Sequence, residues 1–315
     1  MNGTASDRRP SGATALRRYG DTAQAANSFT GGPSLLADVA GEVFAAEVEA
    51  ARRSGNLGYM ARILAQVTLP HSRPNGSEYV RRNGHLTLSV QAPSHIGLPY
   101  GGLPRMILSW LTTEAVRTHE RTLVLGPTLT RFMAEIGLVP TGGRWGTIPR
   151  FQEQIRRLFA ARIFCSYDDH HKSLGTGMDV ASYYQLWWDP KEPTRTPTWQ
   201  STVILGEQFF QEVIERPVPI DTTALRMLKR SPLALDLYFW MTHRFSYLDQ
   251  PTTIPWTALH AQFGADYERT RDFRAKLSSS LKKVSVVYPE ANFDVEASGI
   301  RLLPSRTHVG KLPTR

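Results

Sequence analysis

The sequence contains a single cysteine, Cys165. One thiol can form neither an internal disulfide nor a thiolate metal cluster, and a chain without a disulfide framework is typical of a reducing cytoplasm. Long apolar runs are lacking as well. The longest apolar-looking stretch, residues 103–116, is interrupted by Arg105 and Glu114, and it falls short of the roughly 18 to 20 residues that span a bilayer. No apolar core follows the four arginines of the first 18 residues. The sequence therefore predicts neither a membrane span nor a secretory signal.

Motifs for catalysis are missing from the sequence too. There is no G-x-x-x-x-G-K-[ST] loop for ATP hydrolysis. A rolling-circle nickase needs two histidines separated by one apolar residue to hold a metal, whereas His170 and His171 are adjacent and would point to opposite faces of a strand. Tyr183 and Tyr184 are interpreted as packing residues of a strand. The sequence thus predicts no catalytic residue, no metal site and no cofactor, and we expect a protein that is not an enzyme.

The sequence does have an excess of positive charge. Lysine and arginine number 37 against 28 aspartate and glutamate residues, which gives a net charge of +9 and a pI of about 9.8. A basic balance of this size favours a polyanionic partner, and nucleic acid is the usual one. The alternative is a basic surface that only aids solubility. The position of the charges along the chain decides between the two.

The N-terminal part divides into a tail and an extension. Residues 1–33 are rich in Gly, Ser, Thr, Ala and Arg without a hydrophobic period, which predicts a disordered tail. Residues 34–75 are expected to form a helical extension that contains a short amphipathic helix over residues 35–50. A β-hairpin is predicted over residues 80–90, because Asn83-Gly84 is a type I′ turn signal and alternating apolar residues follow it.

A first winged-helix domain is predicted over residues 76–189. A winged helix is a helix-turn-helix variant with a β-hairpin wing. The expected order is a helix, a strand, two helices and two wing strands: residues 103–118, 123–125, 128–136, 148–161, 162–167 and 178–188. Residues 168–177 are expected to form the polar turn of the wing. Apolar residues at helical spacing support the helices, and Gly137 is placed to end the second one.

A Pro/Thr-rich linker, residues 190–201, is expected to lead into a second winged-helix domain over residues 202–305. Helices capped by Asp221 and Asp266 belong to this domain. Its expected helices are residues 208–214, 221–229, 233–247, 257–263 and 266–284. Its expected strands are residues 202–205, 252–256, 286–288, 293–295 and 300–303. Residues 306–315 form a basic tail. The sequence therefore predicts an α+β, mainly helical fold with two tandem winged-helix domains and a disordered N-terminal tail.

The helix over residues 266–284 carries the strongest sign of function. A helical wheel places an apolar face on Thr270, Phe273, Leu277, Leu281 and Val284. Residues 266–283 hold six Lys and Arg residues against three acids. An adjacent exposed face and its flanks carry the residues predicted to bind DNA: Arg271, Arg274, Ser278 and Lys282, with Arg269, Lys276 and Lys283. Arginine can donate two hydrogen bonds to guanine and lysine reaches phosphates, so this helix suits a major groove.

The first domain has a weaker counterpart in the helix over residues 148–161. Phe151, Ile155 and Leu158 are expected to face inward. The outward face is expected to carry Arg150, Gln154 and Arg157, and Arg144 in the preceding Gly-rich loop is placed to meet a phosphate. A helix that packs at a protein interface is the alternative for this segment.

Several motifs, which occur in a fixed order, resemble the family of plasmid-encoded RepA replication initiators. The resemblance covers roughly residues 57–305 and is densest over 95–163. The motifs are Thr68-Leu-Pro-His-Ser72, Asn83-Gly-His-Leu-Thr-Leu-Ser89, Gly97-Leu-Pro-Tyr-Gly-Gly-Leu-Pro-Arg105, Trp110-Leu-Thr-Thr-Glu-Ala-Val-Arg117, Leu123-Val-Leu-Gly126, Thr141-Gly-Gly-Arg-Trp-Gly146 and Arg156-Arg-Leu-Phe159.

The resemblance implies a protein of the bacterial cytoplasm that binds iteron repeats in the double-stranded DNA of a plasmid origin. Such a protein helps to open the origin, recruits the host replication initiator and the replicative helicase, represses its own gene as a dimer and so takes part in copy control. It implies no catalytic residue. Two alternatives stay open: a winged-helix transcriptional regulator without a role in replication, and a hydrolytic enzyme or nickase.

A monomer–dimer equilibrium is expected as well. The helix over residues 103–118 carries more apolar side chains than one small domain easily covers, among them Met106, Ile107, Trp110, Leu111 and Val116. The hairpin over residues 80–90 would offer free backbone groups if it lies at the edge of a sheet. We therefore predict self-association through residues 80–120, with packing of these side chains inside the domain as the alternative.

Overall fold

The computed structural model describes residues 56–309, apart from residues 67, 170, 190, 198–199 and 265–266. Over the described residues the fold is a mixture of helices and strands, as the predicted α+β class requires. The predicted tail of residues 1–33, the helix over 35–50 and residues 310–315 of the basic tail lie outside the described residues. So do His170 and Asp266, the predicted helix cap.

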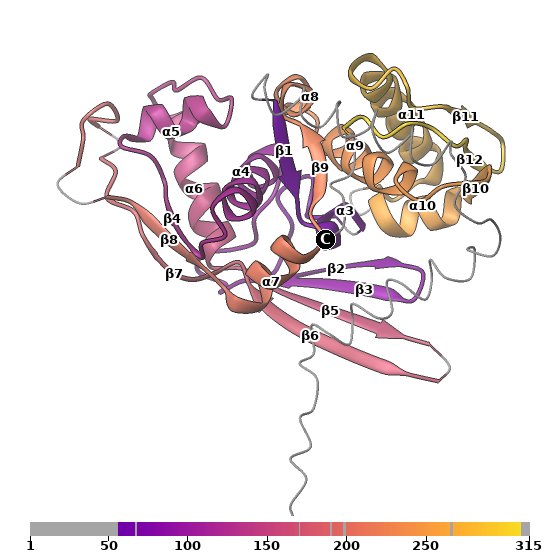
Figure 1. The fold of residues 1–315 in the computed structure, drawn as a ribbon, viewed down its shortest axis with the longest axis horizontal. Helices are drawn as coiled ribbons and strands as arrows, with labels where there is room; N and C mark the ends of the chain where they lie inside the picture. Colours follow the sequence, from indigo (N-terminus) through magenta and orange to yellow (C-terminus); the bar gives the residue numbers. More distant parts are fainter. Residues whose placement is uncertain are drawn as a thin grey trace, which may run out of the picture.

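The first unit of the fold combines three helices with a three-stranded sheet (Figure 1). Its elements in chain order are α4 (Gly102–Thr118), β4 (Thr122–Val124), α5 (Leu129–Glu135), α6 (Thr147–Phe159), β7 (Ala181–Gln185) and β8 (Thr202–Leu205). The strands pair antiparallel in the order β4-β8-β7. Thr128 caps α5 by accepting a hydrogen bond from the backbone nitrogen of Arg131, and Gly137 follows the helix with a φ of 79°. The three predicted helices and the strand between them are confirmed.

A four-stranded antiparallel sheet is formed by two hairpins, one that precedes α4 and one between α6 and β7. It contains β2 (Glu78–Asn83), β3 (Leu86–Gln91), β5 (Arg162–Asp168) and β6 (Ser173–Asp179), in the order β2-β3-β5-β6. The predicted hairpin over residues 80–90 is confirmed as β2 and β3. The predicted pairing of residues 162–167 with residues 178–188 holds only for Met178 and Asp179, because β5 pairs with β6, most of which lies in the segment predicted as a turn.

Two glycines explain that error. Gly175 and Gly177 resemble turn residues in the sequence, yet both lie within β6. The ring of Phe164 lies across Gly175 and the guanidinium of Arg162 lies across Gly177, where a Cβ atom would come within 2.7 Å and 2.9 Å of these groups. Side chains of β5 thus occupy the space that larger residues of β6 would need.

The predicted linker, residues 190–201, connects two strands that are hydrogen-bonded neighbours. Tyr184 of β7 pairs with Val203 of β8. The chain between them returns to the first unit, since the backbone nitrogen of Thr130 donates to the carbonyl oxygen of Pro193 at 3.1 Å. Trp188 stacks on Phe132 of α5, with ring centroids 5.5 Å apart. The division of the chain into domains at residues 190–201 stays a prediction, and β8 extends the sheet of the first unit.

The second unit repeats the order helix, strand, two helices, two strands. Its elements are α9 (Pro232–Phe245), β10 (Thr252–Pro255), α10 (Trp256–Phe263), α11 (Thr270–Val287), β11 (Phe293–Val295) and β12 (Gly299–Leu302), with the strand order β10-β12-β11. The predicted strand at residues 286–288 is wrong, because α11 continues to Val287. Of the basic tail, residues 306–309 are described, and Val309 is buried.

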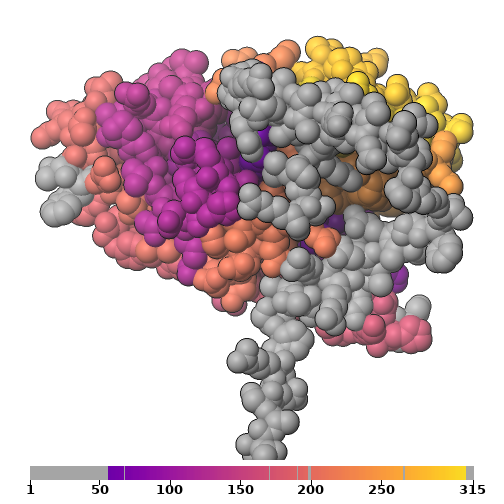
Figure 2. All heavy atoms as spheres, in the orientation of Figure 1, coloured from indigo at the N-terminus to yellow at the C-terminus, as the bar shows by residue number. Residues whose placement is uncertain are grey.

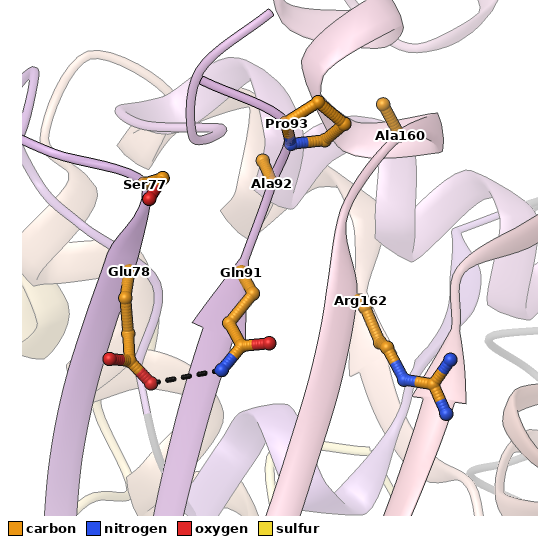
Figure 3. A pocket seen from close by; sticks show the side chains of 7 residues that line it. All are labelled: Ser77, Glu78, Gln91, Ala92, Pro93, Ala160 and Arg162. Atoms are coloured by element: carbon orange, nitrogen blue, oxygen red, sulfur yellow. Dashed lines mark hydrogen bonds between the residues drawn. The ribbon is translucent and has the colours of Figure 1, made fainter.

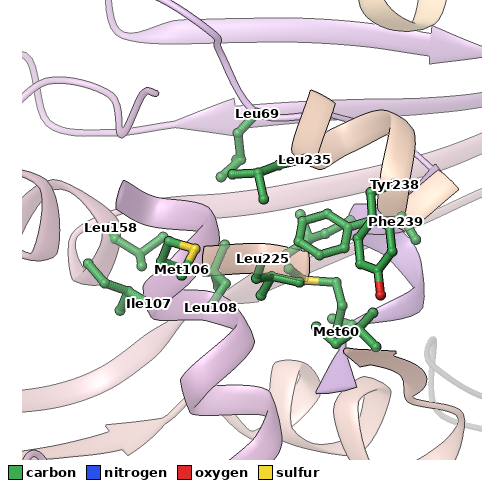
Figure 4. Packing of buried hydrophobic residues seen from close by; sticks show 14 of the residues in the cluster. Met60, Leu69, Met106, Ile107, Leu108, Leu158, Leu225, Leu235, Tyr238 and Phe239 are labelled. Carbon is green, nitrogen blue, oxygen red and sulfur yellow. The ribbon is translucent and has the colours of Figure 1, made fainter. Parts of the chain in front are cut away.

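The remaining elements join the two units. The strands β1 (Leu57–Met60) and β9 (Val218–Asp221) pair antiparallel. The helix α8 (Thr222–Leu228) contacts β9, α3 (Arg62–Gln66) contacts α9, and α7 (Glu207–Glu215) contacts α4 and α3. The predicted cap of α8 is confirmed, because Asp221 accepts a hydrogen bond from the backbone nitrogen of Ala224. A single hydrophobic core runs through both units. Within it α4 contacts α9, and Figure 4 shows core side chains of both helices, such as Met106 of α4 and Leu235 of α9.

A buried ion pair crosses this same contact. Arg105 of α4 donates two hydrogen bonds of 2.6 Å to the two carboxylate oxygens of Asp236 of α9. Nε2 of His71 lies 2.7 Å from Oδ2 of Asp236. Arg105 also donates to the carbonyl oxygens of Leu69, Pro70 and Gly101. Burial raises the pKa of Asp236, but the charge of Arg105 and the hydrogen bonds from His71 and Arg105 outweigh it, so the pKa lies below its usual value. The pair fixes α4 against α9.

The apolar surface of α4 is covered within the chain. Met106, Ile107 and Leu111 are buried by the surrounding elements. Trp110 is half-buried, packs edge-on against Phe132 at 4.8 Å between centroids and donates its indole N–H to the Glu135 carboxylate. The excess of apolar side chains on this helix therefore gives no support to self-association.

Candidate nucleic-acid interface

The core-facing side of α11 is formed by apolar residues at helical spacing. Phe273, Leu277, Leu281 and Val284 are buried, as the sequence predicts. Thr270 is the exception, since it is exposed at the first position of the helix. The buried side chains pack α11 against α9 and α10, so the orientation of its opposite face is fixed by the core.

The opposite face of α11 is basic and open to solvent. Figure 2 shows α11 in yellow at the upper right of the molecular surface. Ser278 is half-buried. The exposed predicted DNA-binding residues of this helix and its N-cap are Arg269, Arg271, Arg274, Lys276, Lys282 and Lys283. Asp272 adds one carboxylate near the start of the helix. The face therefore has a net positive charge, which is the electrostatic requirement for contact with DNA phosphates.

Arg274 is held in place by an aromatic ring. Its guanidinium carbon lies 5.0 Å from the centroid of the Trp256 ring, within the range of a cation–π interaction. Trp256 begins α10 and is buried, and its indole N–H donates to the carbonyl oxygen of Glu296 at 3.1 Å. The same side chain thus contacts the basic helix and the turn between β11 and β12. A restrained arginine loses less conformational entropy when it binds a base edge.

The hairpin of β11 and β12 carries charges of both signs, with the exposed Arg301 of β12 opposite Asp294. Asp294 lies on β11, Glu296 lies in the turn, and Val295 between them is 50% exposed. Carboxylates next to a phosphate backbone are repelled. The charges of the second unit therefore favour contact with a polyanion through α11 over contact through this hairpin.

The first unit differs from its predicted arrangement. Gln154 and Arg157 are buried, so their prediction as outward-facing residues of α6 is wrong. Gln154 accepts a hydrogen bond from the backbone nitrogen of Tyr100 at 2.9 Å. Arg157 donates to the carbonyl oxygen of Leu98 at 3.0 Å and to the carboxylate of Glu153 at 2.7 Å. Both side chains hold the segment that precedes α4 against α6, a contact that the periodicity of α6 alone does not reveal.

Arg144 and Arg150 are exposed, as predicted. Arg156 is also exposed and lies on the outer side of α6, two turns beyond Pro149 and Arg150. The predicted DNA-binding residues do not include Arg156, although its spacing of seven residues from the exposed Pro149 places the two on one side of the helix.

The loop before α6 presents an aromatic side chain as well. Trp145 is 81% exposed, and the guanidinium of Arg144 lies 5.1 Å from its ring centroid. Two hydrogen bonds close the loop. The backbone nitrogen of Thr141 donates to the hydroxyl of Thr147 at 2.8 Å, and the backbone nitrogen of Thr147 donates to the hydroxyl of Thr141 at 2.9 Å. The first unit thus offers a defined basic loop, with fewer charges than α11.

The structure also contains a shallow pocket of about 400 Å³ at one end of the four-stranded sheet (Figure 3). Glu78 in this pocket accepts hydrogen bonds from Ser89 at 2.6 Å and from Gln91 at 3.0 Å, and these bonds lower the pKa of Glu78. Its other polar side chains belong to Ser77, Gln91 and Arg162. Of these groups, Glu78 and Gln91 hydrogen-bond each other at the sheet surface, and the pocket does not join a nucleophile to a base.

The described part of the chain has neither the residue groups of a metal site nor a membrane-spanning helix. Among residues 56–309 with the gaps given above, no group of three or more His, Cys, Asp and Glu side chains is arranged to hold a metal ion. Within the same residues, no helix has the length and apolar character that crossing a membrane requires.

Comparison with known proteins identifies the family. The family model described as plasmid-encoded RepA protein matches residues 98–257, just over half of the chain. The chain belongs to this family of plasmid-encoded RepA proteins.

The fold has a counterpart among solved structures. A crystal structure of domains 2 and 3 of RctB shares 12% identity, with a TM-score of 0.51, over 79% of this chain and 99% of that chain. A second crystal structure of RctB domains 2–3 shares 15% identity over 71% and 83% of the two chains, with a TM-score of 0.46. At this level of identity the first similarity shows the fold alone. The comparison with curated proteins found no match.

Proposed function

We propose that this protein is a plasmid replication initiator that binds iteron repeats in the double-stranded DNA of its origin. The observation that carries the proposal is the basic face of α11, with Arg271, Arg274 and Lys282 exposed on a helix whose other side is fixed in the core. Membership in the plasmid-encoded RepA family supports the role in replication. Binding at the origin would then promote its opening and the recruitment of the host initiator and the replicative helicase, without a catalytic step in this chain.

Each unit is proposed to act as a winged helix. The order helix, strand, helix, helix, strand, strand and the strand order in which the last strand lies in the middle of the sheet support this in the second unit. The first unit has the same strand order once β5 and β6 are treated as an insertion, with β7 and β8 in the place of the wing. In this arrangement α11 and α6 correspond to the helices that enter a major groove.

A winged-helix transcriptional regulator is the second candidate. The basic face of α11 does not distinguish such a regulator from an initiator, because either protein would read duplex DNA through this helix. Repression of its own gene by a dimer would make the two functions overlap.

Footprinting tests the proposal directly. Purified protein is titrated onto the DNA that flanks its coding sequence, and hydroxyl-radical cleavage is mapped on both strands. We expect protection of direct repeats, each covering two successive major grooves about 10.5 base pairs apart. Protection confined to a palindrome in the promoter would favour the regulator, and the absence of any sequence-specific protection would exclude both. A nicking assay on the same DNA in supercoiled form with Mg²⁺ tests the nickase alternative, for which we expect no cleavage.

A further inference from the structure

The short helix α8 has a charged outer face that the predicted DNA-binding residues do not include. Ala224, Leu225 and Leu228 of this helix are buried. Thr223, Arg226 and Met227 are exposed, as is Arg230 just beyond the helix, and Met227 is 62% exposed. Their spacing of three, four and seven residues places them on one side of the helix. Residues 222–230 contain Arg226, Lys229 and Arg230 and no acidic residue.

Two of these cations fasten α8 to the first unit. Lys229 donates from Nζ to the carbonyl oxygen of Gly137 at 2.6 Å. Arg226 donates to the carbonyl oxygen of Glu135 at 3.4 Å, and its side-chain stem lies against Gly137, where a Cβ atom would come within 2.6 Å. Both carbonyls lie at the end of α5, where a helix leaves its acceptors unpaired and favours positive charge. The end of α5 and the start of the loop before α6 are therefore adjacent to α8.

The same helix reaches the second unit. It contacts α9 and α11. Figure 1 shows α5, α8 and α11 in succession along one edge of the molecule, with the four-stranded sheet on the other side. A duplex that met both the basic loop before α6 and the basic face of α11 would therefore pass α8.

We infer that α8 and the residues just beyond it form a third DNA-contacting element, in which Arg230 meets the phosphate backbone between the regions read by α11 and by the first unit. This inference rests on the proposed function, because it takes duplex DNA as the ligand. Charge complementarity favours DNA over an acidic protein segment, since residues 222–230 carry three cations and no acid, and α8 lies next to both the end of α5 and the basic helix α11. Met227 lies on the same exposed side, where its flexible apolar side chain can pack against sugars. Contact with the backbone carries no sequence information, but it fixes the register of the two reading helices.

The test measures equilibrium binding of the full chain to two duplexes of equal length, one from the DNA that flanks its coding sequence and one of random sequence. Arg230→Ala is expected to weaken binding to both duplexes by the same factor, roughly three- to tenfold. The slope of log affinity against log salt should become shallower by about one. Arg162→Ala is the matched control, because it removes an exposed arginine from the four-stranded sheet. It should leave both quantities unchanged.

A second pair of variants tests the same surface without removing a cation. Met227→Glu places a carboxylate where the backbone is expected to pass and should weaken binding to both duplexes, whereas Met227→Gln should not. Circular dichroism confirms that each variant is folded. If Arg230→Ala and Met227→Glu bind as the control does while Arg274→Ala loses affinity for the specific duplex, the inference about α8 is wrong and the proposed function stands. If Arg274→Ala also binds as wild type does, the proposed reading through α11 fails instead.

Discussion

Gly97 lies directly against the guanidinium of Arg157. A Cβ atom at Gly97 would come within 2.6 Å of Nη1 of Arg157, and the backbone there has a φ of +82°, which glycine adopts without strain. Arg157 also lies over the Tyr100 ring, at 5.5 Å from its centroid. This arginine therefore organises the chain that leads into α4, although the sequence alone places it among the DNA-binding residues.

The contact with Gly97 distinguishes Arg157, which has a structural role, from Arg150, which is exposed on the same helix. Arg157→Ala should lower the free energy of unfolding by about 2 kcal/mol, because buried acceptors lose a charged donor. Arg150→Ala, on the same helix, should change it by less than about 0.5 kcal/mol, as is usual for exposed sites. Urea denaturation of both variants measures the difference. Equal stability of the two variants would contradict the structural role of Arg157.

Arg274 is expected to contribute most to specificity. Arg274→Ala should cost about 1–3 kcal/mol at the specific site if this arginine contacts a base, and should relax the preference at that position. Trp256→Phe keeps a ring but loses the N–H that Glu296 accepts, so we expect a smaller loss in the same direction. Binding titrations against the specific site and its single-base variants measure both effects. Unchanged binding by Arg274→Ala would show that another face of α11, or another helix, reads the DNA.

The Arg105–Asp236 pair predicts a pH-dependent stability. The pKa of Asp236 is lower in the folded chain than the unfolded value of about 3.9. Its carboxylate therefore stabilises the fold fully above that value, and the contribution is lost as the pH falls through the folded pKa. Asp236→Asn leaves Arg105 buried without a carboxylate and should cost about 3–5 kcal/mol at neutral pH. The difference in unfolding free energy between wild type and variant should shrink as the pH drops below about 4. A difference that stays constant down to pH 2 would contradict this role.

Self-association through residues 80–120 stays a prediction, and the exposed side chains of the hairpin β2–β3 allow a sharper test of it. Leu88 is buried and therefore unsuitable for mutation. Val80, on the edge strand β2, is 45% exposed and points away from the core, as does Phe164 at 43%. Val80→Glu should leave the circular dichroism spectrum unchanged and shift the sedimentation of a dimer towards that of a monomer. Val80→Thr is the control of similar shape. A folded Val80→Glu variant whose sedimentation matches wild type at every concentration would remove this strand from the interface.

The helices were the most predictable elements, because their faces follow from spacing alone. Phe273, Leu277, Leu281 and Val284 recur at helical intervals and share one face of the helix, and all four are buried. The basic face of α11 follows from the same spacing. The sequence by itself thus determined which side of this helix is exposed and which charges it carries, and its motifs indicated the family.

The tertiary structure decided which strands pair and which polar side chains are buried. β5 pairs with β6 and β7 with β8 because Gly175 and Gly177 make room for side chains of β5, and because the segment of residues 190–201 returns to α5. Gln154 and Arg157 have the spacing of exposed residues, yet the chain from Gly97 to Gly101 packs over them. Periodicity records only the orientation of a residue on its own element. Whether that side of the element is buried depends on segments far away in sequence, and only the folded chain brings these segments together.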